Sequence, residues 1–379
     1  MNIRRGMLED RDRIIEFSNT AFFTPEYSVD FPSLIPKLYG KNRETQEQHW
    51  LMEENGELRG LLCAQPMTLR VLNESLKAGY IGTVAVHPEF RGKGLMGKLI
   101  RHAQEAMEQE GCMFSVLGGQ RQRYEFFGYE PAGVQWNFTV NSHNLRQATD
   151  RPTVSLQALG EEDLLWKEAA ALHARLPLHC DRIAENFYTI LQTWNALPIV
   201  VLQDGKFAGY LSLSQDCGRF TVQELVLKDP LIAPAVCEIL LREYVGEKFT
   251  VVLPNLPGRL QHFFASVCET ASLSANHSYC FFNWEGTVRA LLRFACANRA
   301  LQDGSLILCI LGEETLRLSV KNGEAEVVSC AGESAQLTLT PLEASQILFS
   351  PHSGLINSTP LIPAGWFPLP LYLSFADAV

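Results

Sequence analysis

Apolar positions in the first part of the chain alternate between helical and strand spacing. Residues 7–18 have the amphipathic spacing of a helix, and residues 94–111 repeat apolar side chains every three to four positions, which predicts a second helix. Residues 60–65, 71–86 and 112–117 are apolar runs bounded by turn residues and predict strands. Strands that precede a strand–helix–strand unit favour a mixed α/β sheet.

The middle of the chain repeats this order without a glycine-rich loop. A polar, irregular stretch near residues 143–154 predicts a domain boundary, which we place after residue 145. Residues 161–195 have a helical pattern, and Asp204-Gly205 then predicts a hairpin turn with positive φ angles. A strand, a helix and a strand follow at 220–253. We therefore predict that residues 146–283 form a second, degenerate α/β domain.

A third unit is predicted from Trp284 to the end of the chain. A helix pattern over residues 288–298 leads to short strands, two of which are joined by an Asn322-Gly323 hairpin turn. Residues 284–379 thus predict a small α+β domain. The expected fold is two mixed-sheet α/β domains, residues 1–145 and 146–283, followed by this α+β domain.

Charge and composition narrow the function. The 379 residues include 32 Lys+Arg and 42 Asp+Glu, a formal charge of -10, which disfavours nonspecific nucleic-acid binding and suits a cationic amine substrate. The N-terminus lacks the apolar core of a signal peptide, and no stretch approaches the roughly 18 apolar residues of a membrane span. Ten cysteines occur without a C-x-x-C pair, so we expect no metal site and no disulfide framework. The predicted setting is cytoplasmic, with no membrane partner.

The most informative segment is a strand, a glycine-rich basic loop and a helix. The strand ends at Val86, and the loop Arg91-Gly92-Lys93-Gly94 precedes the helix. A helix N-terminus presents unpaired N–H groups and a partial positive charge, and glycine lets the backbone approach a phosphate closely. The segment therefore predicts a site for a diphosphate.

Two common phosphate motifs fit less well. Gly92-x-Gly94-x-x-Gly97 matches the dinucleotide fingerprint, but the next strand ends near Leu117-Gly118-Gly119 with no carboxylate to hold a ribose. No G-x-x-x-x-G-K-[ST] sequence occurs, which excludes a P-loop. Coenzyme A is the remaining diphosphate ligand that we consider.

The loop resembles the GNAT acetyltransferase superfamily, whose pyrophosphate loop is [RQ]-x-x-G-x-[GA]. Met96 departs from the last small position, but the ligand contact there is a main-chain N–H. The resemblance implies acetyl-CoA as cosubstrate. Main-chain groups of the strand would hold its pantetheine arm, and the loop would bind its diphosphate. The cofactor-binding residues that we expect are Val84, Ala85, Val86, Arg91, Gly92, Lys93, Gly94, Leu95, Met96, Gly97, Gly119 and Gln120.

The sequence after the next strand resembles one branch of that superfamily, the Eis (enhanced intracellular survival) family. Tyr124-x-x-Phe127-Gly128-Tyr129 and the large residue at Met96 carry this resemblance. It implies a GNAT domain, a degenerate GNAT domain and a sterol-carrier-protein-like C-terminal domain. It also implies a homo-oligomer, commonly a hexamer, that acetylates aminoglycosides or other amines.

The same resemblance assigns catalytic roles. Tyr124 corresponds to the tyrosine that protonates the leaving thiolate, and Tyr129 is expected in the core. The general base would be the chain's terminal carboxylate, here that of Val379. The backbone N–H of Thr83 is a candidate donor to the thioester oxygen.

The amine pocket and the alternatives remain open from sequence. Asp30, with Phe22 and Phe23, is predicted to line an acidic, aromatic pocket for a small cationic amine or a lysine side chain. One alternative is a lipid-binding or CoA-binding protein without transferase activity, because the C-terminal domain resembles sterol carriers. The intact loop and Tyr124 favour the acetyltransferase.

Overall fold

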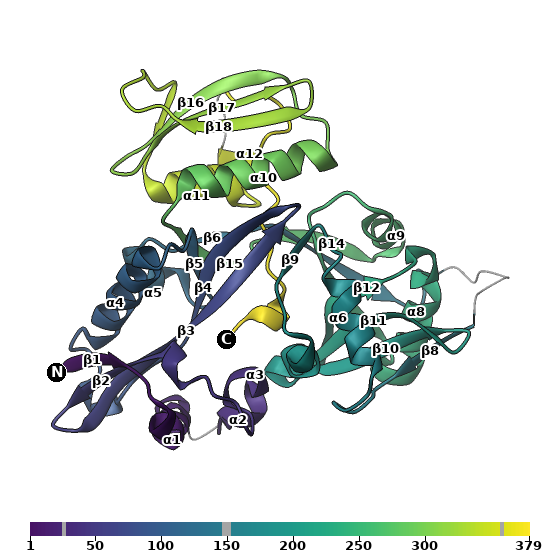
Figure 1. Ribbon diagram of the computed structural model, residues 1–379. Coiled ribbons are helices and arrows are strands. Elements are labelled where there is room, and N and C mark those ends of the chain that lie inside the picture. The colour runs from purple at the N-terminus through teal and green to yellow at the C-terminus, as the bar shows by residue number, and fades with distance from the viewer. Residues whose placement is uncertain (25–27, 146–152, 357–359) are drawn as a thin grey trace. The chain divides into compact units, whose positions relative to one another are not determined.

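The computed structural model describes residues 1–24, 28–145, 153–356 and 360–379 (Figure 1). The chain divides into two compact units. The first comprises residues 1–133, 276–371 and 378–379, and the second comprises residues 134–275 and 372–377. The boundary predicted after residue 145 adjoins residues 146–152, which lie outside the described part.

The first sheet follows the order β1-β2-β3-β4-β5-β15-β6. Its strands are β1 (Asn2–Arg5), β2 (His49–Glu54), β3 (Glu57–Val71), β4 (Glu74–Val86), β5 (Phe114–Leu117), β6 (Glu130–Ala132) and β15 (His277–Phe281). Strands β4 and β5 are parallel, whereas β3 and β4 are antiparallel, so the sheet is mixed as predicted.

Two helices near the start of the chain arise where the sequence predicted them, with shifted ends: α1 (Arg11–Phe22) and α4 (Leu95–Gln109). Three short helices, α2 (Phe31–Leu34), α3 (Pro36–Tyr39) and α5 (Arg121–Tyr124), were not predicted. The apolar side of α4 is buried through Leu95, Leu99, Ala103 and Met107, whose spacing of three to four residues forms one helix face. This burial fixes the N-terminus of α4 at the end of the glycine-rich loop.

The second sheet follows the order β14-β7-β13-β12-β11-β10-β8. Its strands are β7 (Gln135–Asn141), β8 (Val154–Gln157), β10 (Leu197–Gln203), β11 (Lys206–Asp216), β12 (Arg219–Leu227), β13 (Lys248–Pro254) and β14 (Thr270–Ser274). The hairpin at Asp204-Gly205 is confirmed, with φ angles of 50° and 74°. Strands β12 and β13 are parallel, so this sheet is mixed too.

The helical prediction for residues 161–195 is only partly correct. Helices α6 (Leu165–His173) and α7 (Phe187–Gln192) lie in this range, but Leu178–Cys180 between them is an extended strand, β9. Helices α8 (Ala233–Ile239) and α9 (Arg259–Val267) complete the second unit.

Strand β15 lies between β5 and β6, and β7 lies between β13 and β14. Strand β7 thus belongs to the second sheet although it directly follows β6 in the chain, and β15 returns to the first sheet after β14. The two sheets share this arrangement of an inserted antiparallel strand.

The C-terminal part contains a four-stranded sheet of order β18-β17-β16-β19. Its elements are α10 (Trp284–Asn298), β16 (Gly304–Ile310), β17 (Thr315–Lys321), β18 (Glu324–Ser329), β19 (Leu337–Leu339), α11 (Pro341–Phe349) and α12 (Ser353–Ile356). The Asn322-Gly323 turn is confirmed, with φ angles of 52° and 79°. Two mixed α/β sheets followed by a small α+β sheet confirm the predicted fold class.

Candidate active site

Strands β4 and β5 separate at one end of the first sheet. Their parallel pairing ends at Ile81 and Leu117, and β4 continues for several residues beyond this pair. At the same place the pairing of β3 with β4 shifts, because Cys63 opposes Gly82 while Leu61 opposes Ala85. One extra residue on β4 makes a β-bulge, a feature that bends a strand next to many active sites.

The glycine-rich loop connects this end of β4 to α4. Gly92 and Gly94 have φ angles of 78° and 75°, a region that glycine adopts without steric cost. A Cβ built on either glycine meets nothing within 4 Å, so both main-chain segments face open space. Gly94 is the N-cap of α4, and glycine has no side chain that could cap the helix. The first turn of α4 therefore presents N–H groups without a side-chain cap.

A pocket of about 840 Å³ lies over this loop. Most of the predicted cofactor residues line it, together with the two predicted aromatic residues: Val84, Ala85, Val86, Arg91, Gly92, Gly94, Leu95, Met96, Gly97, Phe22 and Phe23. The structure thus brings together the end of β4, the glycine-rich loop with the start of α4, and the end of α1, which is distant in sequence.

Other predicted residues have different surroundings. The ammonium of Lys93 lies 4.3 Å from the ring centre of Phe90. Asp30 caps α2, and its carboxylate accepts hydrogen bonds from the N–H and hydroxyl of Ser33 at 3.2 and 2.5 Å. Gln120 is the N-cap residue of α5. Lys93, Asp30 and Gln120 are not among the described residues that line the 840 Å³ pocket.

Two arginines that the sequence analysis missed also line the pocket. Arg101 follows Gly97 by one turn of α4, and Arg123 directly precedes Tyr124. The guanidinium of Arg101 lies 5.2 Å from the ring centre of Phe127, another lining residue. The i, i+4 spacing from Gly97 could have predicted Arg101, because such residues share a helix face. With Arg91, they give the pocket a positive charge that suits an anionic ligand.

Tyr124 is buried beside Gly119. Its side chain is 8% exposed, and burial raises the pKa of its hydroxyl, an effect that the charge of Arg123 and its hydrogen bond partly offset. A Cβ on Gly119 would come within 2.6 Å of the Tyr124 ring, and the φ of Gly119 is 145°. Only glycine fits there without moving the ring.

Tyr129 is a core residue, as predicted. It is fully buried, and its hydroxyl is hydrogen-bonded to that of Ser115 at 2.7 Å. Burial raises the pKa of Tyr129 well above its ordinary value. Its hydroxyl therefore has a partner within the core.

The C-terminus is buried against β4. Val379 is 6% exposed, and a Cβ built on Gly82 would overlap its carbonyl carbon and oxygen. The end of the chain therefore lies next to Thr83 and the β-bulge.

A buried polar cluster that sequence analysis missed contacts the bulge. The hydroxyl of Tyr39 donates to Oγ1 of Thr83 at 2.8 Å, and lies 2.8 Å from Nε2 of His49. Thr83 itself has a φ of 47°, which is rare for a β-branched residue. Burial lowers the pKa of His49 to about 4, so its ring is neutral at pH 7. No local spacing links these residues, and no sequence signal would have found them.

Comparison with known proteins decides the class of this site. Residues 2–132 match the family model described as an acetyltransferase (GNAT) domain. The first part of the chain is a GNAT acetyltransferase domain. The bulged β4, the glycine-rich loop and α4 all lie within this GNAT domain. No curated protein matches the chain in sequence.

Solved structures share the fold along nearly the whole chain. A GCN5-related N-acetyltransferase from Anabaena variabilis is 16% identical, with 100% of each chain covered and a TM-score of 0.67. Eis1 from Mycobacterium abscessus is 14% identical, with 92% of this chain and 89% of that chain covered and a TM-score of 0.63. A GCN5-related N-acetyltransferase from Kribbella flavida is 15% identical, with 91% and 88% covered and a TM-score of 0.62. The chain beyond the GNAT domain therefore also shares its fold with these three solved structures.

Two further findings concern metals and membranes. In the described ranges, no group of three or more His, Cys, Asp or Glu residues could hold a metal ion. No helix within those ranges is both long and apolar enough to cross a membrane.

Proposed function

We propose that this protein transfers an acetyl group from acetyl-CoA to a primary amine. The observation that carries the proposal is the pocket over the GNAT domain's loop, where β4 has separated from β5. Gly92 and Gly94 have positive φ angles, which a residue with a Cβ would adopt only with backbone strain, and helix α4 begins there. These features fit a diphosphate, because N–H groups at a helix N-terminus bind such anions.

The loop would hold the diphosphate through the N–H groups of residues 92–97. Arg91, Arg101 and Arg123 line the same pocket and supply positive charge to phosphate groups. Val84, Ala85 and Val86 line it along β4, where main-chain groups would bind the pantetheine arm. Lys93, Gly119 and Gln120 stay in the proposal as flanking residues, since the pocket's lining does not include them. Acetyl-CoA supplies the acetyl group as a thioester and leaves as a thiolate.

Tyr124 is proposed as the general acid. It would donate its proton to the sulfur atom as the carbon–sulfur bond breaks. Burial raises the pKa of Tyr124, so its hydroxyl keeps its proton at neutral pH, as this role needs. Gly119 contributes by leaving room for the Tyr124 ring.

The α-carboxylate of Val379 is proposed as the general base. An alkylamine with a pKa of about 10.4 is mostly protonated at pH 7 and must lose a proton before it attacks the thioester. The carboxylate would accept this proton, which frees the lone pair of the amine to form the carbon–nitrogen bond with the thioester carbon. The position of Val379 against Gly82 supports this role, because the β-bulge and Thr83 come directly after Gly82. The N–H of Thr83 is proposed to donate to the thioester oxygen.

The acceptor is proposed to be a small cationic amine or a lysine side chain. Phe22 and Phe23 line the pocket and remain partly exposed, at 39% and 59%, so their rings are available to an incoming molecule. A cationic amine gains from aromatic faces. Asp30 would add negative charge near this edge, while its carboxylate also caps α2.

A thiol-release assay with acetyl-CoA tests the function directly. Aminoglycosides, polyamines and lysine peptides would be screened as acceptors, and at least one class should give turnover above the hydrolysis of acetyl-CoA alone. A C-terminal extension should suppress turnover while CoA still binds, because it removes the carboxylate of Val379. Full turnover with the extension would contradict the proposed base.

Assembly and location extend the same proposal. The resemblance to Eis proteins supports a homo-oligomer, proposed as a hexamer that acts in the cytoplasm, and a sterol-carrier-like C-terminal domain. Light scattering on the purified full chain tests the oligomer, since a monomer of 42.4 kDa would exclude a hexamer.

A further inference from the structure

Thr83 adopts a backbone conformation that its own side chain disfavours. Its φ of 47° lies in the left-handed region, where β-branched residues are strained. The β-bulge places this strain on β4, between Gly82, which faces the terminal oxygen of Val379, and Val84, which lines the cofactor pocket. Such strain persists only where surrounding groups hold the residue in place.

Tyr39 contacts the side chain of Thr83. Its hydroxyl donates to Oγ1 of Thr83 at 2.8 Å, and both side chains are buried, at 3% and 7% exposure. Removal of a hydrogen bond in such surroundings is costly, because Oγ1 of Thr83 would be left without a partner and without access to water. The bond therefore ties the side chain of Thr83 to α3.

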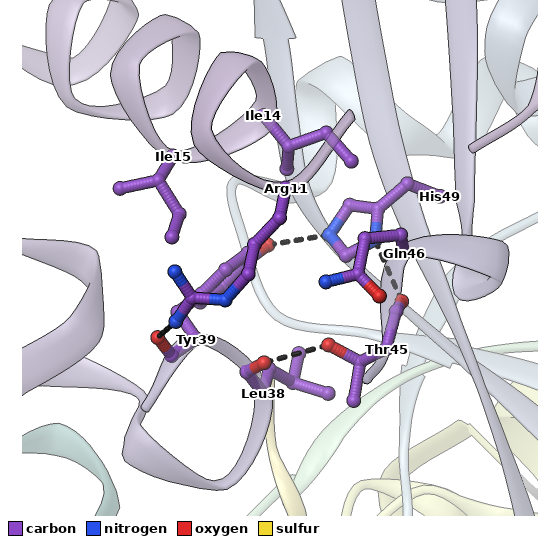
Figure 2. A pocket seen from close by; sticks show the side chains of 8 residues that line it. All are labelled: Arg11, Ile14, Ile15, Leu38, Tyr39, Thr45, Gln46 and His49. Atoms are coloured by element: carbon purple, nitrogen blue, oxygen red, sulfur yellow. Dashed lines mark hydrogen bonds between the residues drawn. The ribbon is translucent and has the colours of Figure 1, made fainter. Parts of the chain in front are cut away.

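Tyr39 is in turn held from several directions. Nε2 of His49 lies 2.8 Å from the Tyr39 hydroxyl, and Nδ1 of His49 lies 3.0 Å from the carbonyl oxygen of Thr45 (Figure 2). The guanidinium of Arg11 donates to the carbonyl oxygens of Tyr39 and Gly40 at 2.9 and 3.0 Å. Figure 2 shows these groups converging from α1, α3 and the start of β2.

Little space is left for Tyr39 to move. The cavity bounded by Arg11, Tyr39 and His49 has a volume of only about 10 Å³, roughly that of one water. The rings of Tyr39 and His49 lie 5.4 Å apart, and Phe31 packs edge-on against Tyr39 at 5.3 Å. The Tyr39 hydroxyl is thus fixed by packing as well as by hydrogen bonds.

We infer that Tyr39, supported by His49, is a positioning residue that holds the strained bulge at Thr83 in the geometry needed for acetyl transfer. The inference rests on the proposed function. Without this hydrogen bond, Thr83 can relax toward negative φ. Rotation about that residue re-aims the N–H groups of Thr83 and Val84 relative to the pantetheine arm and to the carboxylate beside Gly82.

The first test is Tyr39→Phe, which removes one oxygen and keeps the ring. We expect kcat to fall about 10-fold to 100-fold, because a misaimed main-chain donor affects the transition state more than the bound substrate. The KM for acetyl-CoA should change less than about twofold, because the loop at residues 92–97 is untouched. An unchanged kcat would overturn the inference.

Tyr80→Phe is the matched control. Tyr80 is also on β4 and buried, and its hydroxyl lies 3.2 Å from Nδ1 of His277, so the variant also removes a buried hydroxyl from a tyrosine–histidine pair. It lies in the regular part of β4, where the strand pairs with both β3 and β5. We expect a similar loss of thermal stability but an unchanged kcat. An equal fall of kcat in both variants would mean that Tyr39 acts only through the overall stability of the fold. That result would overturn the inference.

A double-mutant cycle locates the effect at Thr83. Thr83→Val keeps the branched shape and removes the hydroxyl. If Tyr39 acts through that hydroxyl, Tyr39→Phe should have little further effect on kcat in the Thr83→Val background. Fully additive effects would contradict the inference.

Hydrogen exchange on the full chain gives a readout that does not depend on activity. The main-chain amides of residues 82–86 should exchange faster in Tyr39→Phe than in Tyr80→Phe or the unaltered protein, because the bulge is no longer held. If the unaltered protein transfers no acetyl group to any acceptor, the proposed function fails, and this exchange experiment alone decides whether Tyr39 holds the bulge. Equal exchange in all three proteins would overturn that role.

Discussion

The carbonyl oxygen of Val379 lies so close to the α-carbon of Gly82 that no side chain fits between them. Gly82 is the last residue of β4 before the β-bulge, and Val379 is buried although it ends the chain. The contact brings the main-chain carbonyl group of Val379, whose α-carboxylate is proposed as the general base, to the place where β4 and β5 of the GNAT domain separate.

Gly82→Ala should displace this carboxylate. The new methyl group would overlap the carbonyl carbon and oxygen of Val379, so we expect kcat for acetyl transfer to fall about 100-fold. CoA affinity, measured by calorimetry, should stay within about threefold. Gly354→Ala is the control, because a Cβ there meets nothing within 4 Å and its φ is not in the left-handed region. Normal turnover of Gly82→Ala would contradict the role of Val379.

Tyr124→Phe should slow the chemical step. Loss of a general acid typically lowers the rate by about 10²-fold to 10⁴-fold, so steady-state kcat should fall within this range. Tyr129→Phe removes a hydroxyl that is hydrogen-bonded to Ser115 at 2.7 Å, and should cost about 1 kcal/mol of stability with kcat retained. If the two variants had equal kcat, Tyr124 would not be the acid.

The pH profile should keep its activity into the alkaline range. Burial raises the pKa of Tyr124 above its usual 10.0, so its hydroxyl stays protonated up to that pH. Ionisation of Tyr124 should therefore lower the activity only above about pH 10. The measurement is kcat against pH for the best acceptor, with the stability of the protein checked at each pH. A fall of kcat centred near pH 8, absent from Tyr124→Phe, would contradict this assignment.

Arg182→Met should destabilise the second unit. Its guanidinium donates to Glu224 at 2.8 and 2.7 Å and to Asp377 at 2.9 Å twice, and its side chain is 2% exposed. Removing it leaves two buried carboxylates without their cation, which costs about 3–5 kcal/mol in chemical denaturation. Arg242→Met removes only a surface pair with Glu243 and should cost below about 1 kcal/mol.

The same network predicts sensitivity to acid. Burial would raise the pKa of Glu224, but Arg182 and His173 outweigh it and hold this pKa well below 4.5. A lowered pKa in the folded state means that the stabilisation is present above pH 4.5 and is lost as the pH falls below it. Arg182→Met should therefore lose less stability than the unaltered protein between pH 5 and pH 3. An identical pH dependence would exclude the network as its source.

The glycine-rich loop could be predicted from sequence because the interactions that shape it are local. Gly92, Gly94 and the apolar spacing of α4 act over a few residues, and the structure bears out the turn and the helix. The two hairpins were found for the same reason, since Asp204-Gly205 and Asn322-Gly323 set their own φ angles.

Features that depend on distant partners could not be predicted. Nothing in β7 or β15 reveals which sheet each joins, because strand pairing is decided between segments far apart in the chain. The Tyr39–Thr83 bond joins residues 44 positions apart. The role of Asp30 as the N-cap of α2 could have been predicted from sequence. An Asp followed by a proline and a serine within the next three residues is a typical helix start.

The most direct test of the account is a crystal structure of the full chain with coenzyme A. We predict the diphosphate at residues 92–97, within hydrogen-bonding distance of main-chain N–H groups that open α4, and the pantetheine arm along Val84–Val86. A complex in which this turn is empty while coenzyme A is bound elsewhere would contradict the account.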